Sequence, residues 1–115
     1  MSASHFSPRL TCALSCLRPR VEQEMQRRGL QLLSCHNNAQ VWREFLRSAG
    51  WKNVEKQQGV AILSKPIWHS AFGQWMTEIP HTWLTIRDID GRTKIFDGST
   101  AQFQGQPAKY VKKSS

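Results

Sequence analysis

Hydrophobic residues recur every three or four positions between Asn38 and Ala49, with polar residues between them. The apolar positions are Ala39, Trp42, Phe45, Leu46 and Ala49. This spacing places their side chains on one face of a helix. Ser34 or Asn37 can cap its start, and Gly50 supplies a left-handed residue after its end. The pattern therefore predicts a helix over residues 38–49.

A weaker helical pattern comes earlier, from Val21 to Leu33, where apolar residues alternate with Glu, Gln and Arg. Pro19 suits the first turn of such a helix, and Gly29 is expected to end or loosen it. The next few residues, 30–34, would then be a short connection that leads to Cys35. The first residues, 1–7, are small and polar, and we expect the whole segment 1–17 to be poorly ordered or loosely packed.

The second half of the chain has strand patterns. The run VAIL at residues 60–63 predicts a short strand that Pro66 stops, and residues 67–79 indicate an irregular segment or another strand that lines a cleft. Residues 82–87 and 93–97 predict two strands joined by a turn at Asp90-Gly91. Residues 104–115 are polar and basic, which is typical of a tail. We therefore expect one α+β domain over residues 18–103.

The turn at Asp90-Gly91 decides which side chains of the hairpin share a face. A two-residue loop would pair Ile89 with Arg92 and would place His81 and Asp97 on opposite faces. A three-residue loop over residues 89–91, with Gly91 at positive φ, pairs Trp83 with Asp97 instead. His81 then lies diagonally beside the carboxylate. We predict the three-residue loop or a bulge.

Composition narrows the class of protein. The chain has 115 residues, enough for one domain, and no apolar run approaches the roughly 20 residues of a membrane helix. Residues 10–17 are a poor match to a cleaved signal, so we expect a cytoplasmic protein or one exported without such a signal. The three cysteines leave at least one thiol free. The net charge of +8 indicates an anionic partner.

Cys35, His81 and Asp97 are candidates for a catalytic site. A thiol reacts as the thiolate, and both a helix start and a neighbouring imidazolium lower the pKa of a thiol. Cys35 lies just ahead of the predicted helix, and His81 and Asp97 lie on the two strands of the predicted hairpin. The sequence therefore predicts a nucleophilic thiol served by a histidine whose ring a carboxylate orients.

The run SCHNNAQVWREFLRSAG, followed by HTWLTI and KIFDGSTAQF, resembles the papain-like and transglutaminase-like superfamily of cysteine enzymes. Gln102-Phe103 is similar to the same region of small bacterial papain-fold toxin and effector domains. The resemblance implies a cysteine-bearing helix on a small antiparallel sheet, with Cys35 as nucleophile, His81 as general base and acid, and Asp97 as orienting group.

The same resemblance implies further roles around the thiol. The backbone N–H of Cys35 would belong to the oxyanion hole, for which Gln31 is a side-chain candidate, although its spacing to the cysteine differs from that in papain. Trp83 and Gln102 are candidates for the cleft lining. Ser34 occupies the place of the usual transglutaminase-like glycine.

Simpler readings remain open for each of these residues. Cys35 could be an inert buried cysteine, His81 could bond a backbone carbonyl, and Asp97 could stabilise a turn through its own backbone. The spacing Cys12-x-x-x-Cys16, with Cys35 and His36, is compatible with zinc but lacks a second close ligand pair. The tryptophans and arginines could form a surface that stacks on nucleic-acid bases.

Taken together, the sequence favours a thiol acyl-transfer enzyme without a cofactor. It would attack an amide carbonyl of a protein or peptide, with an acidic one favoured by the net charge of +8, as a cysteine protease, a glutamine deamidase or a transglutaminase does. The alternative is a non-catalytic basic binding protein on a papain-like scaffold, with nucleic acid or an acidic protein as its partner.

Overall fold

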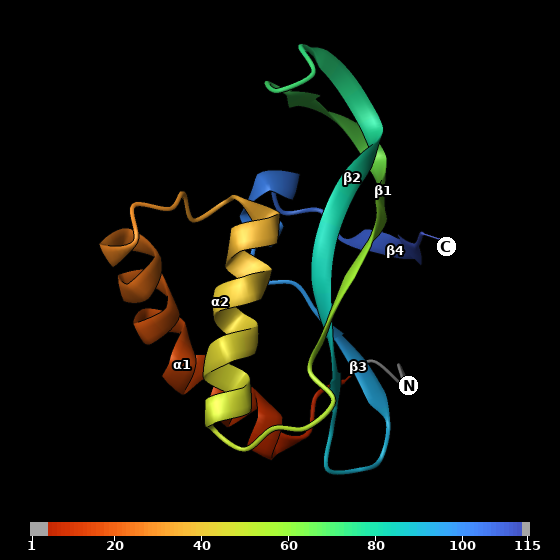
Figure 1. Cartoon of the computed structure of the whole chain (residues 1–115). Coiled ribbons are helices and arrows are strands. Elements are labelled where there is room, and N and C mark those ends of the chain that lie inside the picture. The colour runs from red at the N-terminus through yellow and green to blue at the C-terminus, as the bar shows by residue number, and fades with distance from the viewer. Residues whose placement is uncertain (1–4, 114–115) are drawn as a thin grey trace.

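The computed structural model describes residues 5–113, which form an α+β fold of two helices followed by a four-stranded antiparallel curled sheet. Figure 1 shows the two helices side by side, with the sheet beside α2. Contacts from α2 reach α1 and the strands β1 and β2. The elements in chain order are α1 (Pro8–Arg27), α2 (Cys35–Ser48), β1 (Glu55–His69), β2 (Gln74–Arg87), β3 (Thr93–Phe96), the 3-10 helix η1 (Thr100–Phe103) and β4 (Ala108–Lys112).

Helix α1 starts eleven residues before the predicted start at Pro19, because Pro8, at the first turn, begins it. Ser7 caps the helix, and Pro19 lies inside it. An internal proline costs about 3 kcal/mol, whereas burial of one large aliphatic side chain contributes about 1.5–3 kcal/mol. The free energy gained by burying the apolar face of α1 outweighs that cost. The buried residues of this face are Leu10, Leu14, Leu17, Val21 and Met25.

The predicted loose packing of residues 1–17 is therefore wrong for the described part of that segment. Leu10, Leu14 and Leu17 belong to the main hydrophobic core, together with residues of α2 and the sheet. The expectation for residues 1–4 lies outside the described residues. At the other end of α1, Gly29 has a φ of +72° and follows the last turn, so the predicted end near this glycine is confirmed.

Helix α2 confirms the most regular pattern of the sequence and begins at Cys35, slightly earlier than predicted. Ser34 occupies the N-cap position, and Gly50, with a φ of +97°, follows the C-terminal end. The buried side chains of α2 include Ala39, Trp42 and Leu46 from the predicted stripe. The thiol of Cys35 is consequently carried by the first turn of a well-anchored helix.

Strands β1 and β2 form a long hairpin, in place of the short strand predicted at residues 60–63, and of the two alternatives for residues 67–79 the structure has the strand. Pro66 does not end β1: the register shifts between Ile62 and Ile67, and pairing with β2 resumes from Ile67 to His69. The irregularity accommodates the proline, which has no N–H to donate to a neighbouring strand. Residues 67–79 thus lie mostly in β1 and β2, joined by a turn at residues 70–73.

The hairpin of β2 and β3 has the predicted three-residue loop. Leu84 pairs with Phe96 and Arg87 pairs with Thr93, and the N–H of Asp88 donates to the carbonyl of Arg92 at 2.9 Å. Residues 89–91 therefore form the loop, with Gly91 at a φ of +81°. The same register, continued past the end of β3, sets Trp83 opposite Asp97. His81 and Asp97 accordingly share one face of the hairpin.

The last strand corrects the predicted tail. Residues 108–112 form β4, which pairs antiparallel with β1, so the sheet order is β3-β2-β1-β4. Val60 faces Val111, and Ala61 faces Tyr110. Residues 114–115 of the predicted tail lie outside the described residues. Neither of the helices within residues 5–113 is both long and apolar enough to span a membrane.

Candidate active site

Asp97 follows β3 directly, and its two carboxylate oxygens have separate partners. Oδ1 accepts hydrogen bonds from the backbone N–H of Ser99 at 3.0 Å and from the Ser99 hydroxyl at 2.9 Å. Oδ2 accepts the phenolic hydrogen of Tyr110 at 2.7 Å and lies 2.6 Å from Nε2 of His81. Although burial opposes ionisation, these partners, His81 foremost, hold the pKa of Asp97 below its usual value.

His81 is buried on β2, and its ring lies 5.0 Å from the ring of Phe103 between centroids. Burial disfavours the imidazolium, but the hydrogen bond to Asp97 and the nearby Cys35 thiol more than offset it and raise the pKa of His81 to about 9. Since Asp97 occupies Nε2, Nδ1 is the ring nitrogen left for the thiol. Within residues 5–113, buried Nδ1 makes no hydrogen bond of ordinary geometry.

Cys35 is the first residue of α2 and is partly exposed. Burial alone would raise the pKa of its thiol. The neighbouring His81 ring, together with the backbone and side chain of Thr82, outweighs burial and lowers the pKa of Cys35 below its usual value. A thiolate at this position is also favoured by the partial positive charge of the helix start. The shifts at Cys35 and His81 both favour a thiolate–imidazolium pair.

The other predicted site residues, Gln31, Trp83 and Gln102, differ in their burial and in their contacts. Gln31 is exposed in the connection before α2, and its backbone carbonyl accepts a hydrogen bond from Ser34. Trp83, expected to line a cleft, is buried with only 3% of its surface exposed, and its ring lies 5.0 Å from that of Tyr110. Gln102 is partly exposed and donates to the carbonyl of Ser99 at 3.1 Å. Trp83 thus contacts Tyr110 and Gln102 contacts Ser99, which are two of the three hydrogen-bond partners of Asp97.

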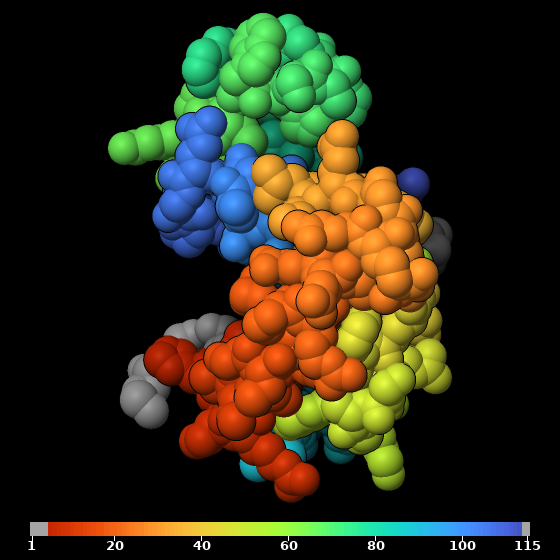
Figure 2. Space-filling model, turned by 90° about the vertical axis from the view of Figure 1, so that its left-hand side faces the viewer, coloured from red at the N-terminus to blue at the C-terminus, as the bar shows by residue number. Residues whose placement is uncertain are grey.

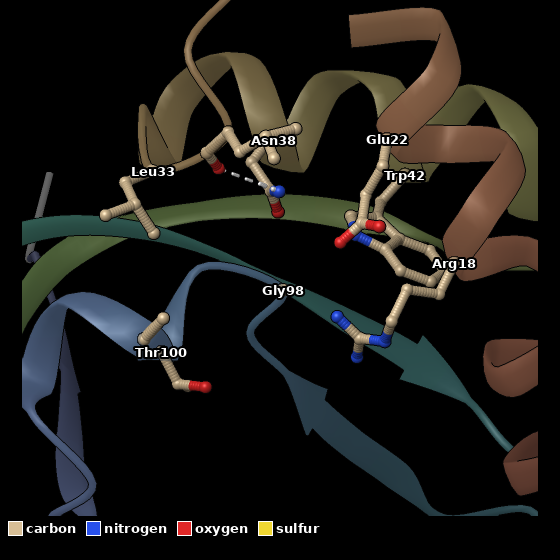
Figure 3. A pocket seen from close by; sticks show the side chains of 9 residues that line it. Arg18, Glu22, Leu33, Asn38, Trp42, Gly98 and Thr100 are labelled. Atoms are coloured by element: carbon tan, nitrogen blue, oxygen red, sulfur yellow. Dashed lines mark hydrogen bonds between the residues drawn. The ribbon is translucent and has the colours of Figure 1, made fainter. Parts of the chain in front are cut away.

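A pocket of about 210 Å³ lies behind Gly98, between α1, α2 and the segment that carries Asp97. Figure 3 shows Arg18 and Glu22 of α1 and Trp42 and Asn38 of α2 around it, with Gly98 and Thr100 opposite. The backbone approaches α2 closely here, because a Cβ at Gly98 would lie 2.4 Å from Nε1 of Trp42 and 2.5 Å from Oδ1 of Asn38. Only glycine allows this approach, which fixes the segment between Asp97 and Ser99 against α2.

Three residues that contribute to the site were not predicted from the sequence: Thr82, Ser99 and Tyr110. Thr82 follows His81 directly, but its contribution to the thiol depends on how α2 packs on β2. Tyr110 is the single tyrosine of the chain, and it lay in the predicted tail. Ser99 offered the clearest signal, because Asp-Gly-Ser is a turn sequence in which a carboxylate caps the following N–H.

Cys12 and Cys16 lie on the exposed surface of α1, apart from Cys35 in the sequence and in the fold. The pKa of Cys16 is raised by the hydrogen bond and the charge of neighbouring Cys12. Across residues 5–113, no group of three His, Cys, Asp or Glu side chains is placed to hold a metal ion. The zinc ligands considered from the sequence are therefore not gathered into one site.

The arrangement of Cys35, His81 and Asp97 can activate a thiol, hold a transferable proton at Nδ1 of the imidazole and keep the ring in one orientation through its other nitrogen. These are the parts required for covalent catalysis at a carbonyl carbon. Comparisons with protein-family models, with curated proteins and with solved structures found no match for this chain. The chemistry of the site is thus the basis for assigning a function.

Proposed function

We propose that this protein is a thiol acyl-transfer enzyme that attacks an amide carbonyl of a protein or peptide through Cys35, His81 and Asp97. The observation that carries the proposal is the 2.6 Å contact between His81 Nε2 and Asp97, which leaves Nδ1 for a thiol whose pKa is lowered. A cysteine-bearing helix on an antiparallel sheet, with His and then Asp on successive elements, also supports a papain-like or transglutaminase-like core.

In the acylation step the Cys35 thiolate attacks the amide carbon, a C–S bond forms, and the carbonyl electron pair moves to oxygen. The imidazolium of His81 gives its Nδ1 proton to the amide nitrogen as the C–N bond breaks, so ammonia or an amine leaves and a thioester remains. The N–H of Cys35 lies in the first turn of α2, where backbone donors lack partners within the helix. It is a natural donor to the developing oxyanion.

Neutral His81 then removes a proton from water or from an amine, which attacks the thioester carbon. The new C–O or C–N bond forms, the C–S bond breaks, and Cys35 returns as thiolate beside the imidazolium. Hydrolysis corresponds to a protease or deamidase, and aminolysis corresponds to a transglutaminase. Partial exposure of Cys35 suits a substrate presented by another protein, and the net charge of +8 suits an acidic one.

Alkylation by iodoacetamide at mildly acidic pH tests the proposal, because only the thiolate reacts. Cys12 and Cys16 are more exposed than Cys35, so access alone would make them react faster. We expect the opposite: Cys35 should be modified faster than Cys12 and Cys16, because its lowered pKa raises its thiolate fraction at mildly acidic pH. Peptide mass spectrometry after timed labelling measures the three rates in one sample.

His81→Ala should abolish the advantage of Cys35, whereas the matched control His36→Ala should keep it, because His36 is an exposed neighbour of the thiol in sequence. Equal and slow labelling of all three cysteines in the chain without substitutions would refute the proposed pair of Cys35 and His81. That result would favour the alternative of a non-catalytic basic binding protein.

A further inference from the structure

The tip of the β1–β2 hairpin, residues 63–77, carries three large aromatic side chains that are exposed. We call it the hairpin tip. Trp68, Phe72 and Trp75 expose 51%, 54% and 65% of their surfaces. Figure 1 shows that the hairpin continues beyond the ends of both helices, and the space-filling view in Figure 2 shows its green tip standing clear of the body. The aromatic side chains are thus carried on a projection, where a flat surface can reach them.

Interactions within the hairpin tip hold these side chains in place. Trp68 and Trp75 face each other across the strands, with ring centroids 5.8 Å apart and edge-to-face geometry. His69 and Phe72 lie 4.7 Å apart at the turn, and Ile67 beneath them is buried. Such cross-strand aromatic pairs stabilise a hairpin without covering its outer surface. The exposed aromatics are therefore ordered before any partner binds.

The charge of the hairpin tip is one-sided. Residues 63–77 contain Lys65 and no Asp or Glu, in a chain whose net charge is +8. Just below the tip, Lys109 of β4 and exposed Glu78 of β2 both pair with Ile62 of β1, so one lysine and one carboxylate flank the base of the tip. An anionic surface would therefore meet Lys65 and aromatic rings at the tip, without a carboxylate from residues 63–77 to repel it.

From this combination we infer that the hairpin tip binds the surface of an anionic lipid bilayer. Tryptophan favours the boundary between headgroups and acyl chains, where its ring is in apolar surroundings and its N–H remains hydrated. A projecting tip suits a deformable lipid surface, whereas a protein partner would have to supply a matching cavity. Lysines near the bilayer each add about tenfold or less to binding at low salt. The attachment is peripheral and independent of the chemistry at Cys35.

Co-sedimentation of the full chain with lipid vesicles tests this inference. The protein should bind vesicles of equimolar phosphatidylcholine and phosphatidylglycerol, and bind pure phosphatidylcholine at least about tenfold more weakly. Trp68→Ser with Trp75→Ser should reduce binding to the anionic vesicles on the order of tenfold or more, since the inserted apolar area is lost. Lys65→Glu should weaken the preference for anionic vesicles without removing an aromatic ring.

The matched control is Ile89→Ser, which removes a side chain that is 60% exposed at the tip of the other hairpin. It should leave vesicle binding unchanged, and circular dichroism should show that each variant keeps the fold. Equal loss of binding in Ile89→Ser and in the tryptophan variant would overturn the assignment to the hairpin tip. Equal binding to neutral vesicles would overturn the anionic preference. Binding to neither vesicle would overturn the inference and leave a protein as the partner of the tip.

Discussion

At the scale of single residues, the two carboxylate oxygens of Asp97 make the contacts expected from two competing interpretations of the sequence. Oδ1 stabilises a turn through the N–H of Ser99, as a turn residue would, while Oδ2 binds His81. The turn fixes the carboxylate, and the fixed carboxylate holds the imidazole. The contacts of Asp97 therefore allow it to orient the ring of His81.

The protonation of His81 can be predicted from these contacts. Its pKa of about 9 in the folded chain lies above the usual 6.5, so folding holds this proton more tightly than the unfolded chain does. The resulting stability is fully present below about pH 6.5 and is lost as the pH rises through about 9. An NMR titration of the imidazole should place its midpoint near 9, and Asp97→Asn should lower that midpoint.

A His81 midpoint near 6.5 in the unmodified chain, or one that Asp97→Asn does not lower, would contradict the coupling described for the pair.

Site residues whose contacts depend on the packing of distant elements could not be predicted from the sequence. Cys35, His81 and Asp97 were accessible because their chemistry and their order along the chain are informative. Tyr110 was not, because its contact with Asp97 exists only after β4 pairs with β1. Thr82 was missed for the same reason, since its effect on Cys35 requires α2 to lie on β2.

At the scale of elements, the spacing of apolar residues predicted a helix correctly, and the alternation of side chains along strands predicted the hairpin loop correctly. The prolines predicted element boundaries that the structure does not have. The stripe of α2 predicted a helix because burial of Trp42 and Leu46 requires that spacing. The three-residue loop at residues 89–91 was predicted because only an odd-length loop places His81 and Asp97 on one face of the hairpin. Pro19 and Pro66 were taken as boundaries, but core packing of α1 and a bulge in β1 accommodate them.

Gly98 connects the packing of α2 to the carboxylate of Asp97. Gly98→Ala would place a methyl group within 2.7 Å of the Trp42 ring, so the segment 97–99 would have to move. We expect a loss of about 1–3 kcal/mol in the free energy of unfolding in urea. Displacement of Asp97 should also reduce the rate advantage of Cys35 in alkylation.

Thr100→Ala is the control for this prediction, because Thr100 is exposed and lines the same pocket. It should change neither stability nor alkylation appreciably. Should Gly98→Ala behave like Thr100→Ala in both measurements, the close approach to α2 would not matter to the site.

At the scale of the whole molecule, a buried polar network ties the start of α1 to the β2–β3 hairpin. The carboxylate of Asp88 accepts hydrogen bonds from the backbone N–H and the hydroxyl of Ser7, and it lies 3.0 Å from Nζ of Lys94. Lys94 also donates to the carbonyl of His5 at 2.6 Å. The segment expected to be loose is therefore fastened to the sheet by side chains almost at the opposite end of the chain.

Ser7 has two roles in this network, because its hydroxyl accepts from the N–H of Leu10 and donates to Asp88. Ser7→Ala should lower the free energy of unfolding by about 1–2 kcal/mol, through loss of the helix cap and of the link to Asp88. Ser15→Ala alters an exposed serine of the same helix and should stay within about 0.5 kcal/mol of the unmodified chain. Equal denaturation curves for both variants would show that the network does not anchor α1.

The position of Tyr110 has a consequence for the time at which the site is completed. A ribosome makes the chain from its N-terminus, so Cys35 and α2 emerge before the strand that carries Tyr110. Until β4 adds to β1, Oδ2 of Asp97 lacks the phenol that shares it with His81. Asp97 therefore gains its full set of hydrogen-bond donors only once β4 pairs with β1, after the helix that carries Cys35 has been synthesised.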